Sequence, residues 1–334
     1  MAETLKIAIP MAGHGTRLRP HTWSKPKPLL SLAGRTTLDF VLDQFKTVPA
    51  EFDVEYVFIL GGMGEQIKAY MAEKHPDKKV HYVVQQVMHG QSAALYLARE
   101  HLHGKMLMAF SDTLLETDLS FLREDSSDGV ALVQPVPDPR RFGVASLDAS
   151  GRVTRYVEKP SDTSNNLAVV GFYYFRQAED LMKAIEEQVR RDIALKGEYF
   201  LTDALNIMLE WGADMRVEQV STWLDAGTVQ AVLDTNALLL QKYGNNGKGA
   251  TLDGVQIISP VYIHPTASIK SSVIGPNVVV DAHCQLEDVI VRNAIIEEHS
   301  HLSRMLLTDS LIGRRTVLAG SSSSLVIGDD SSVR

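Results

Sequence analysis

The sequence contains one cysteine, Cys284, which excludes an internal disulfide and a metal site built from several cysteines. Long apolar runs are also lacking, because no stretch approaches the roughly 18 residues needed to cross a bilayer. The first residues, Met1 to Lys6, do not show the basic-then-apolar order of a signal peptide. We therefore expect a cytoplasmic protein that does not bind membranes.

An excess of positive charge is missing as well, since the 334 residues carry a net charge of −8. Such a field repels nucleic acid, so we expect no nucleic-acid partner. A small anionic substrate can bind only where the local charge opposes this average. The length predicts two domains, and 45% hydrophobic with 22% charged residues is ordinary for a globular protein.

The first 110 residues alternate short apolar strands with helical patterns. We expect strands over residues 5–11, 54–60, 80–84 and 105–110, and helices over residues 38–45, 65–73 and 92–102. Apolar strands separated by helices indicate an α/β fold with a parallel sheet covered on both faces. Such sheets bind ligands at the carboxyl ends of their strands.

The pattern changes after residue 130. Val144–Leu147 and Val153–Val157 flank a turn at Asp148–Gly151, which predicts an antiparallel hairpin, so the sheet should be mixed but mostly parallel. Helices are expected over residues 179–190, 203–210 and 229–240. A Gly- and Asn-rich cluster follows at residues 244–249, so we expect one domain over residues 1–243 and another over residues 250–334.

The second predicted domain has an aliphatic residue every five or six positions. The residues in this pattern are Ile263, Ile269, Ile274, Val280 and Leu286, and further on Ile296 and Leu302 have the same step. This step fits neither an α-helix nor a hairpin sheet, but it suits a solenoid whose coils each turn aliphatic side chains inward. The region resembles the hexapeptide-repeat left-handed β-helix family. A set of irregular β-strands is the alternative.

A glycine-rich, basic segment runs from Ile9 to Leu30, with the sequence IPMAGHGTRLRPHTWSKPKPLL. Its glycines let a phosphate chain approach the backbone N–H groups. The basic residues are Arg17, Arg19, Lys25 and Lys27, and prolines on both sides of Lys27 stiffen its backbone. The segment is neither a Walker A loop nor a dinucleotide fingerprint. Taken alone, it could also be a solvated basic loop.

The whole segment resembles the signature GxGTRLxPxTxxxPKPLL of the sugar-1-phosphate nucleotidyltransferases. The match runs through Gly13, Gly15, Thr16, Arg17, Leu18, Pro20, Thr22, Pro26, Lys27, Pro28, Leu29 and Leu30. The resemblance implies a Rossmann-like catalytic domain in which Ala12, Gly13, Gly15 and Thr16 bind the nucleotide and Arg17 and Lys27 are catalytic.

Two aspartates match the family's metal ligands. Asp112 follows a predicted strand, and Asp225 lies in Trp223–Thr228, which resembles W-x-D-x-G-T. The resemblance implies that both are catalytic and hold Mg²⁺, an ion that takes few protein ligands. This chain has Ser111-Asp112-Thr113 where Gly-Asp-Asn is more usual, so we expect different contacts around the metal. Asp112 could instead cap a following helix.

Gln85 and Gly90 have the spacing that pyrimidine-specific members use to bind the base. A glutamine amide both donates and accepts hydrogen bonds, as a uracil or thymine edge requires, so UTP or dTTP is expected. Gln86 is the alternative contact if the register shifts by one residue. Gln85 could also be a polar residue at a strand end.

Residues of the sugar-phosphate site are implied by further matches. Glu158-Lys159-Pro160 corresponds to the family's E-K-P, in which the acid holds sugar hydroxyls and the lysine holds the phosphate. The remaining expected residues are Gly143, Gly171, Tyr173 and Thr202. The glycines could instead be turns around strands, and Thr202 could be a helix cap.

The family's reaction is in-line attack of a sugar-phosphate oxygen on the α-phosphorus of the nucleotide, with pyrophosphate leaving. It needs no general base, because the phosphate is already ionised. Glucose 1-phosphate is the default sugar, and a mannose-1-phosphate guanylyltransferase is the alternative. A second alternative takes its function from the solenoid and is a bifunctional sugar-phosphate acetyltransferase with His264, His283, His299 or His301 as base. A ligand-sensing homologue is a third possibility, and the open coil edge predicts a homo-oligomer.

Overall fold

The computed structural model describes residues 3–333, with the backbone alone at residues 321–323 and 333. Close contacts group the chain into two compact units, and each unit gathers segments that are distant in sequence. The first unit consists of Met1–Gly13 with Val41–Trp223, and the second of His14–Phe40 with Leu224–Arg334. This grouping differs from the predicted domains 1–243 and 250–334, which remain a prediction.

A mixed sheet forms the first unit. In the order β10-β9-β11-β6-β1-β4-β5 its strands are Val153–Glu158, Gly143–Leu147, Leu167–Phe175, Met106–Ala109, Glu3–Met11, Phe52–Leu60 and Lys79–Val84, and β8 (Gly129–Pro135) and β12 (Met215–Gln219) extend it. Strands β6, β1, β4 and β5 are parallel, as their apolar composition predicted. Strand β11 runs antiparallel to β6, β8 and β9, and β9 pairs with β10 as the predicted hairpin.

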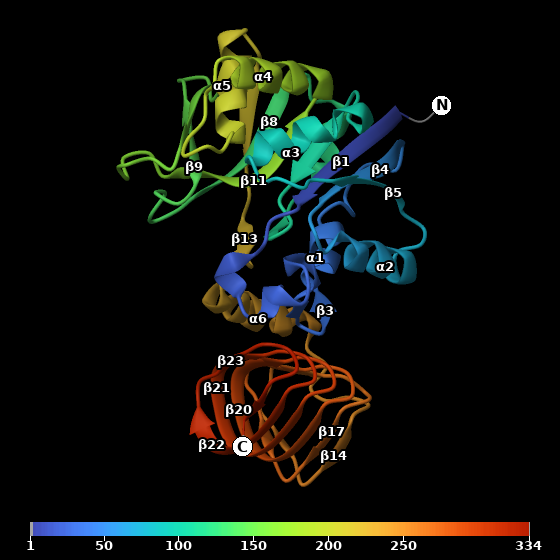
Figure 1. Cartoon of the computed structure of the whole chain (residues 1–334). Coiled ribbons are helices and arrows are strands. Elements are labelled where there is room, and N and C mark those ends of the chain that lie inside the picture. Colours follow the sequence, from blue (N-terminus) through green and yellow to red (C-terminus); the bar gives the residue numbers. More distant parts are fainter. Residues whose placement is uncertain (1–2, 334) are drawn as a thin grey trace. The chain divides into compact units, whose positions relative to one another are not determined.

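Figure 1 shows the helices of the first unit, which are α2 (Gly64–Lys74), α3 (Gln91–Leu97), α4 (Ala178–Arg190) and α5 (Leu201–Glu210), with 3-10 turns η4 (Arg99–His101) and η5 (Leu119–Arg123). Helices α3, α4 and α5 share a hydrophobic core with the sheet. The prediction that one helix runs to Leu102 is wrong. Ala98 leaves helical geometry at φ −91° and ψ 4°, and the chain tightens into η4.

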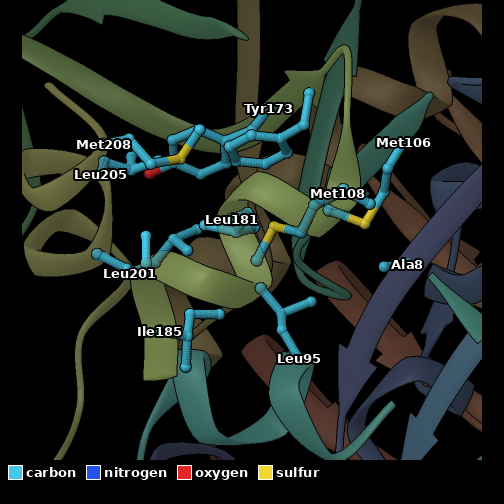
Figure 2. Close-up of a cluster of buried hydrophobic side chains, with 14 of the residues drawn as sticks. Ala8, Leu95, Met106, Met108, Tyr173, Leu181, Ile185, Leu201, Leu205 and Met208 are labelled. Carbon is cyan, nitrogen blue, oxygen red and sulfur yellow. The ribbon is translucent and has the colours of Figure 1, made fainter. Parts of the chain in front are cut away.

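Figure 2 shows the hydrophobic core between α3, α4, α5 and the sheet. Leu95 of α3, Leu181 and Ile185 of α4 and Leu205 of α5 are all fully buried there. Met106 and Met108 of β6 meet them from the sheet. Burying such side chains contributes about 1.5–3 kcal/mol each to the free energy of folding. This core therefore stabilises the sheet whose strand ends carry the candidate site.

The second unit contains a short left-handed β-helix with parallel coils. Its strands are β14 (Thr251–Asp253), β15 (Gln256–Ile257), β16 (Val261–Ile263), β17 (Ser268–Lys270), β18 (Val273–Ile274), β19 (Val278–Val280), β20 (Gln285–Ile296), β21 (His301–Ile312), β22 (Val317–Ser323), β23 (Val326–Ile327) and β24 (Ser332–Val333). Ile269, Leu286, Leu302 and Leu318 stack in register across successive coils. All seven aliphatic residues of the predicted repeat are buried, so the solenoid is confirmed and the irregular-strand alternative is wrong.

The rest of the second unit packs with the β-helix. It comprises the 3-10 turns η1 (Thr16–Leu18), η2 (His21–Trp23) and η3 (Lys27–Leu29), the short strands β2 (Ser31–Leu32) and β3 (Arg35–Thr36), and α6 (Val229–Tyr243). Helix α1 (Thr37–Asp43) and strand β13 (Thr222–Asp225) include residues of both units, and β7 is Thr113–Glu116. No helix within residues 3–333 is both long and apolar enough to cross a membrane.

Candidate active site

The signature segment of the second unit is built from tight turns rather than a regular ladder. Gly15 begins η1 in the left-handed region, with φ 58°, and its carbonyl accepts a hydrogen bond from the Thr22 hydroxyl at 2.8 Å. A Cβ at Gly15 would lie 2.9 Å from the Thr22 methyl and 3.4 Å from Lys27 Cβ. The missing side chain of Gly15 therefore lets the stem of Lys27 approach the turn that carries the exposed Thr16 and Arg17.

Arg17 and Asp225 meet at Gly227. A Cβ at Gly227 would lie 2.8 Å from Asp225 Oδ1 and 3.1 Å from Arg17 Nη2, so both charged groups face the same small space. The backbone carbonyl of Asp225 accepts a hydrogen bond from the Thr235 hydroxyl at 2.7 Å, which ties the strand end to α6. Two residues that lie far apart in the sequence thus form one charged centre in the second unit.

In the first unit, β1 delivers Ala12 and Gly13 to the carboxyl edge of the sheet. Ala12 is buried, whereas Gly13 is exposed and a Cβ added there would meet no atom within 4 Å. Gly61, which follows β4, must lack a side chain because its Cβ would lie 2.4 Å from the Ala12 carbonyl oxygen. The backbone at Gly13 is therefore open to a ligand.

Asp112 occupies the turn that follows β6 at the same edge. Strand β7 begins at the next residue, so the alternative that Asp112 caps a helix is wrong. Thr113 donates its hydroxyl proton to the carbonyl of Val170 at 3.1 Å, and Phe110 N–H donates to the carbonyl of Gly171 at 3.0 Å. These bonds fix the turn on both sides of Asp112, which is half-buried.

Gln85 follows β5 directly and its N–H donates to the carbonyl of Leu60 at 2.8 Å. Gln85 is buried, whereas the alternative contact Gln86 is exposed. Gly90 precedes α3 with φ 96°, and a Cβ there would lie 2.4 Å from the carbonyl oxygen of Tyr199. Only glycine fits this close approach. The contact with Tyr199 therefore fixes the backbone just before α3, in the loop that follows Gln85.

Gly143, Glu158 and Thr202 converge in the first unit. A Cβ at Gly143 would lie 2.9 Å from the Thr202 methyl and 3.2 Å from Glu158 Oε2. Thr202 donates its hydroxyl proton to the same carboxylate oxygen at 3.2 Å. Because Thr202 lies inside α5 and Phe200 is the N-cap residue, the alternative that Thr202 caps the helix is wrong.

Lys159 lies beside this group. Its ammonium is 3.8 Å from Glu158 Oε1 and 4.2 Å from the centre of the Phe200 ring. Burial raises the pKa of Glu158, while Lys159 and the Thr202 hydroxyl act against that shift. An anion near Lys159 and hydroxyl groups near Glu158 would both find complementary partners here.

Gly171 and Tyr173 both lie on β11. Gly171 has φ 77°, and a Cβ there would lie 2.2 Å from the Phe110 ring. Tyr173 is 3% exposed and its ring belongs to the hydrophobic core of Figure 2. Burial is the main cause that raises the Tyr173 pKa, and the charge of Glu158 adds to it, which indicates that the two side chains are near each other.

A metal would be held by oxygen ligands. Within residues 3–333, no group of three or more His, Cys, Asp or Glu side chains gathers into a metal cage. Asp112 and Asp225 are half-buried carboxylates, in the first and second units respectively. Each carboxylate offers oxygen donors of the kind that Mg²⁺ takes, and an ion with few protein ligands keeps positions for water and phosphate oxygens.

The contacts of three residues near the site were not predicted from the sequence. The ring of Phe200 lies under the Lys159 ammonium, and Gly227 separates Arg17 from Asp225. Lys25 is 3% exposed and pairs with Glu297, so it does not face a ligand as the other basic residues of the segment can. The W-x-D-x-G-T match was a signal for Gly227, whereas the contacts of Phe200 and Lys25 depend on distant parts of the chain.

Comparisons with known proteins agree with this arrangement. The profile of the family described as Nucleotidyl transferase matches residues 8–242. Glucose-1-phosphate thymidylyltransferase of Streptomyces griseus is 26% identical over 98% of this chain and 98% of its own length. Bifunctional protein GlmU of Methanococcus maripaludis is 30% identical over 77% of this chain, which spans 59% of that protein.

A solved structure shares the fold. This structure is described as a glucose-1-phosphate thymidylyltransferase from Bacillus anthracis in complex with sucrose. It is 25% identical in sequence to this chain, with a TM-score of 0.61. The similarity covers 70% of this chain and 95% of that one.

Proposed function

Since the chain belongs to the nucleotidyl transferase family, we propose that it joins UTP or dTTP to glucose 1-phosphate and releases pyrophosphate. Its reaction class is nucleotidyl transfer to a sugar 1-phosphate. The observation that carries the proposal is the charged centre at Gly227, where Arg17 and Asp225 face each other. A guanidinium beside a carboxylate suits a site that handles phosphates and a cation together.

The choice of nucleotide rests on Gln85. Its side chain is buried at the carboxyl end of β5, where parallel sheets bind ligands. Its amide can donate to and accept from a pyrimidine edge. The relative from Streptomyces griseus is named for thymidylyl transfer, which supports a pyrimidine. A guanine nucleotide with mannose 1-phosphate is the competing pair.

Residues of the chain divide the work of the reaction. Gly13 and Gly15 open the backbone to the triphosphate, Arg17 stabilises charge on the departing pyrophosphate, and Lys27 stabilises the α-phosphoryl group. Lys159 holds the phosphate of the sugar while Glu158 accepts hydrogen bonds from its hydroxyls. Both reactants are anions, so holding them in line accounts for much of the catalysis.

Asp112 and Asp225 are the residues that would hold Mg²⁺. The bound ion would supply positive charge that offsets the repulsion between the two phosphates. Protein treated with EDTA should therefore release no pyrophosphate until Mg²⁺ is restored. Activity that persists in EDTA would contradict this part of the proposal.

A screen of pyrophosphate release tests the proposal. Each of UTP, dTTP, GTP and ATP is paired with the 1-phosphates of glucose, mannose and N-acetylglucosamine, with Mg²⁺ present. We expect the highest rate with a pyrimidine nucleotide and glucose 1-phosphate. Lys27→Ala and Asp225→Ala should each lose most turnover while the circular dichroism spectrum is unchanged, and full activity in either would remove the mechanism.

Two further expectations belong with this function. A reaction between a nucleoside triphosphate and a sugar phosphate agrees with the predicted cytoplasmic location, and the β-helix is the predicted surface for homo-oligomer formation. The GlmU relative supports a test for an acetyltransferase activity. Acetyl-CoA consumption with glucosamine 1-phosphate, lost on His283→Ala or His299→Ala, would establish that second reaction.

A further inference from the structure

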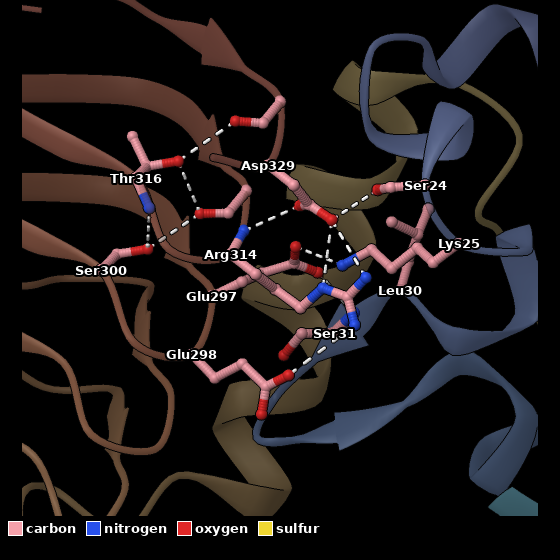
Figure 3. A network of polar contacts seen from close by, with 12 residues as sticks. Ser24, Lys25, Leu30, Ser31, Glu297, Glu298, Ser300, Arg314, Thr316 and Asp329 are labelled. Carbon is pink, nitrogen blue, oxygen red and sulfur yellow. Dashed lines mark hydrogen bonds and ion pairs between the residues drawn. The ribbon is translucent and has the colours of Figure 1, made fainter. Parts of the chain in front are cut away.

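The second unit contains an acidic patch on the β-helix that contacts the signature segment. Glu297 follows β20 and Asp329 follows β23, at corners of the coils, and Asp281 follows β19 one coil before Glu297. Figure 3 shows Glu297 and Asp329 facing Ser24, Lys25 and Ser31 of the segment. We name Asp281, Glu297 and Asp329 the acidic corner.

Glu297 contacts the segment on both sides of Lys27. One carboxylate oxygen forms an ion pair with Lys25, whose side chain is 3% exposed while that of Glu297 is 2% exposed. The other oxygen accepts a hydrogen bond from the N–H of Ser31 at 3.4 Å. Because Lys27 lies between these two anchors, Glu297 limits where the backbone of Lys27 can move.

Asp329 holds the segment one residue earlier. It accepts a hydrogen bond from the hydroxyl of Ser24. Asp329 is itself fixed by Arg314, which donates to it from its backbone N–H at 2.8 Å and from its guanidinium at 3.0 Å. The patch is therefore rigid on the β-helix side, and Gly328 beside it lets Pro20 approach, since a Cβ there would lie 3.0 Å from Pro20 Cβ.

The segment needs such external support. From Thr16 to Leu29 it consists of three separate 3-10 turns, which have few backbone hydrogen bonds of their own. A lysine and a glutamate that are both buried are costly to desolvate, and removing one partner leaves the other charge unpaired. In general, such a buried ion pair adds little net stability to the fold, but it favours one conformation of the segment.

We propose that the acidic corner is a positioning device for catalysis: Glu297 and Asp329, acting through Lys25 and Ser24, hold the segment that carries Arg17 and Lys27. Lys25 and Glu297 are thus positioning residues, and both side chains are buried. The inference rests on the proposed function for its kinetic consequence, but its structural consequence, a fixed segment 14–31, can be measured without substrate.

Lys25→Met is the main variant, and Lys25→Arg is the conservative one. A displacement of about 1 Å at reacting groups can cost roughly 100-fold in rate. We expect kcat/KM for the nucleotide to fall by about that factor in Lys25→Met, with KM for the sugar phosphate changed far less, since Lys159 belongs to the first unit. Lys25→Arg keeps the charge and should recover much of the loss.

Asp330→Asn is the matched control for Asp329→Asn. The two residues are neighbours on one coil, but Asp330 pairs with Arg315, which lies outside the signature segment. Asp329→Asn should raise KM for the nucleotide, and Asp330→Asn should behave as the parent protein. Equal effects of both variants would indicate a general weakening of the coil and would overturn the inference.

Hydrogen exchange separates this inference from the proposed function. Amides of residues 14–31 should exchange faster in Lys25→Met and Glu297→Gln, with β20 and β21 unchanged. If the parent protein releases no pyrophosphate from any pair, the proposed function fails while the exchange experiment still decides the inference. Unchanged exchange at residues 14–31 overturns it. If Lys25→Met does not fold, Glu297→Gln and the charge-free double variant Lys25→Met/Glu297→Met give the same comparison.

Discussion

At the scale of single residues, Gly227 is the position where the smallest change should have the largest effect on turnover. Gly227→Ala adds a Cβ at 2.8 Å from Asp225 Oδ1 and 3.1 Å from Arg17 Nη2, so one of these groups must shift. We expect kcat to fall roughly 100-fold with little change in the melting temperature. Steady-state kinetics and thermal unfolding measure the two effects.

Gly62→Ala is the control for that substitution. A Cβ at Gly62 would meet no atom within 4 Å. We therefore expect activity close to that of the parent protein. A Gly227→Ala enzyme as active as Gly62→Ala would show that the charged centre tolerates displacement and would contradict its proposed role.

Asp281 should make stability depend on pH. Burial and the nearby Glu297 and Glu298 raise the pKa of Asp281 to about 7, whereas Lys25 and a hydrogen bond from Ser31 act in the opposite direction. The folded state thus holds a proton that the unfolded state releases near pH 4, so the free energy of unfolding falls as pH rises from about 4 to about 7. We expect Asp281→Asn to remove this fall and to be roughly 1–4 kcal/mol more stable than the parent at pH 8.

Urea unfolding at pH 5, 6, 7 and 8 measures the dependence on pH. The Asp281→Asn protein should show a flatter profile, with its advantage growing toward pH 8. Parallel profiles for the two proteins would mean that Asp281 ionises normally and that the acidic corner does not penalise its charge.

At the scale of elements, α6 begins directly after the charged centre. Its N-cap Thr228 accepts a hydrogen bond from the N–H of Ala231 at 3.2 Å, and Thr235 binds the carbonyl of Asp225. Thr228→Ala removes the cap and should lower the free energy of unfolding by about 1 kcal/mol. Thr228→Ser keeps the oxygen and should lie closer to the parent in chemical denaturation, so equal losses in both variants would rule out the cap as the cause.

The spacing of apolar residues predicted several of the elements correctly. The apolar strands β1, β4, β5 and β6 and the inward aliphatic residues of the β-helix needed only their own spacing. The end of α3 was not predictable in this way, because Ala98 is a good helix former and leaves the helix only in the folded packing. Thr202 likewise resembled a cap by residue type, while its partner Glu158 comes from β10.

The candidate site was predictable to the extent that its residues lie in one continuous motif. The family signature indicated Arg17 and Lys27 because charge and glycine spacing are local properties. Lys25 and Lys27 are both lysines of this segment. Lys25 is buried against Glu297, which lies more than 250 residues later in the chain. Sequence spacing cannot distinguish a lysine that binds a ligand from one that fixes the loop.

At the scale of the whole molecule, the boundary between the two compact units falls within the signature segment, after Gly13. The segment up to Gly13 belongs to the first unit, whereas His14–Phe40 belongs to the second, together with α6 and the β-helix. The second unit therefore combines part of the signature segment with the β-helix. Arg17, Lys27 and Asp225 thus belong to the same compact unit as the β-helix.

This grouping leads to a prediction for a chain that ends at Tyr243. If residues 1–243 fold independently, as the glycine-rich cluster at residues 244–249 suggests, the shortened protein should keep its activity. We expect the opposite, because removal of the β-helix unpairs Lys25 and exposes His21, which is fully buried in the whole chain. An unpaired lysine and uncovered turns should leave residues 14–40 sensitive to protease and lower kcat/KM by at least roughly 100-fold. Limited proteolysis and pyrophosphate release measure both effects, and a shortened enzyme with full activity and a protected segment would contradict this expectation and support the predicted domains 1–243 and 250–334.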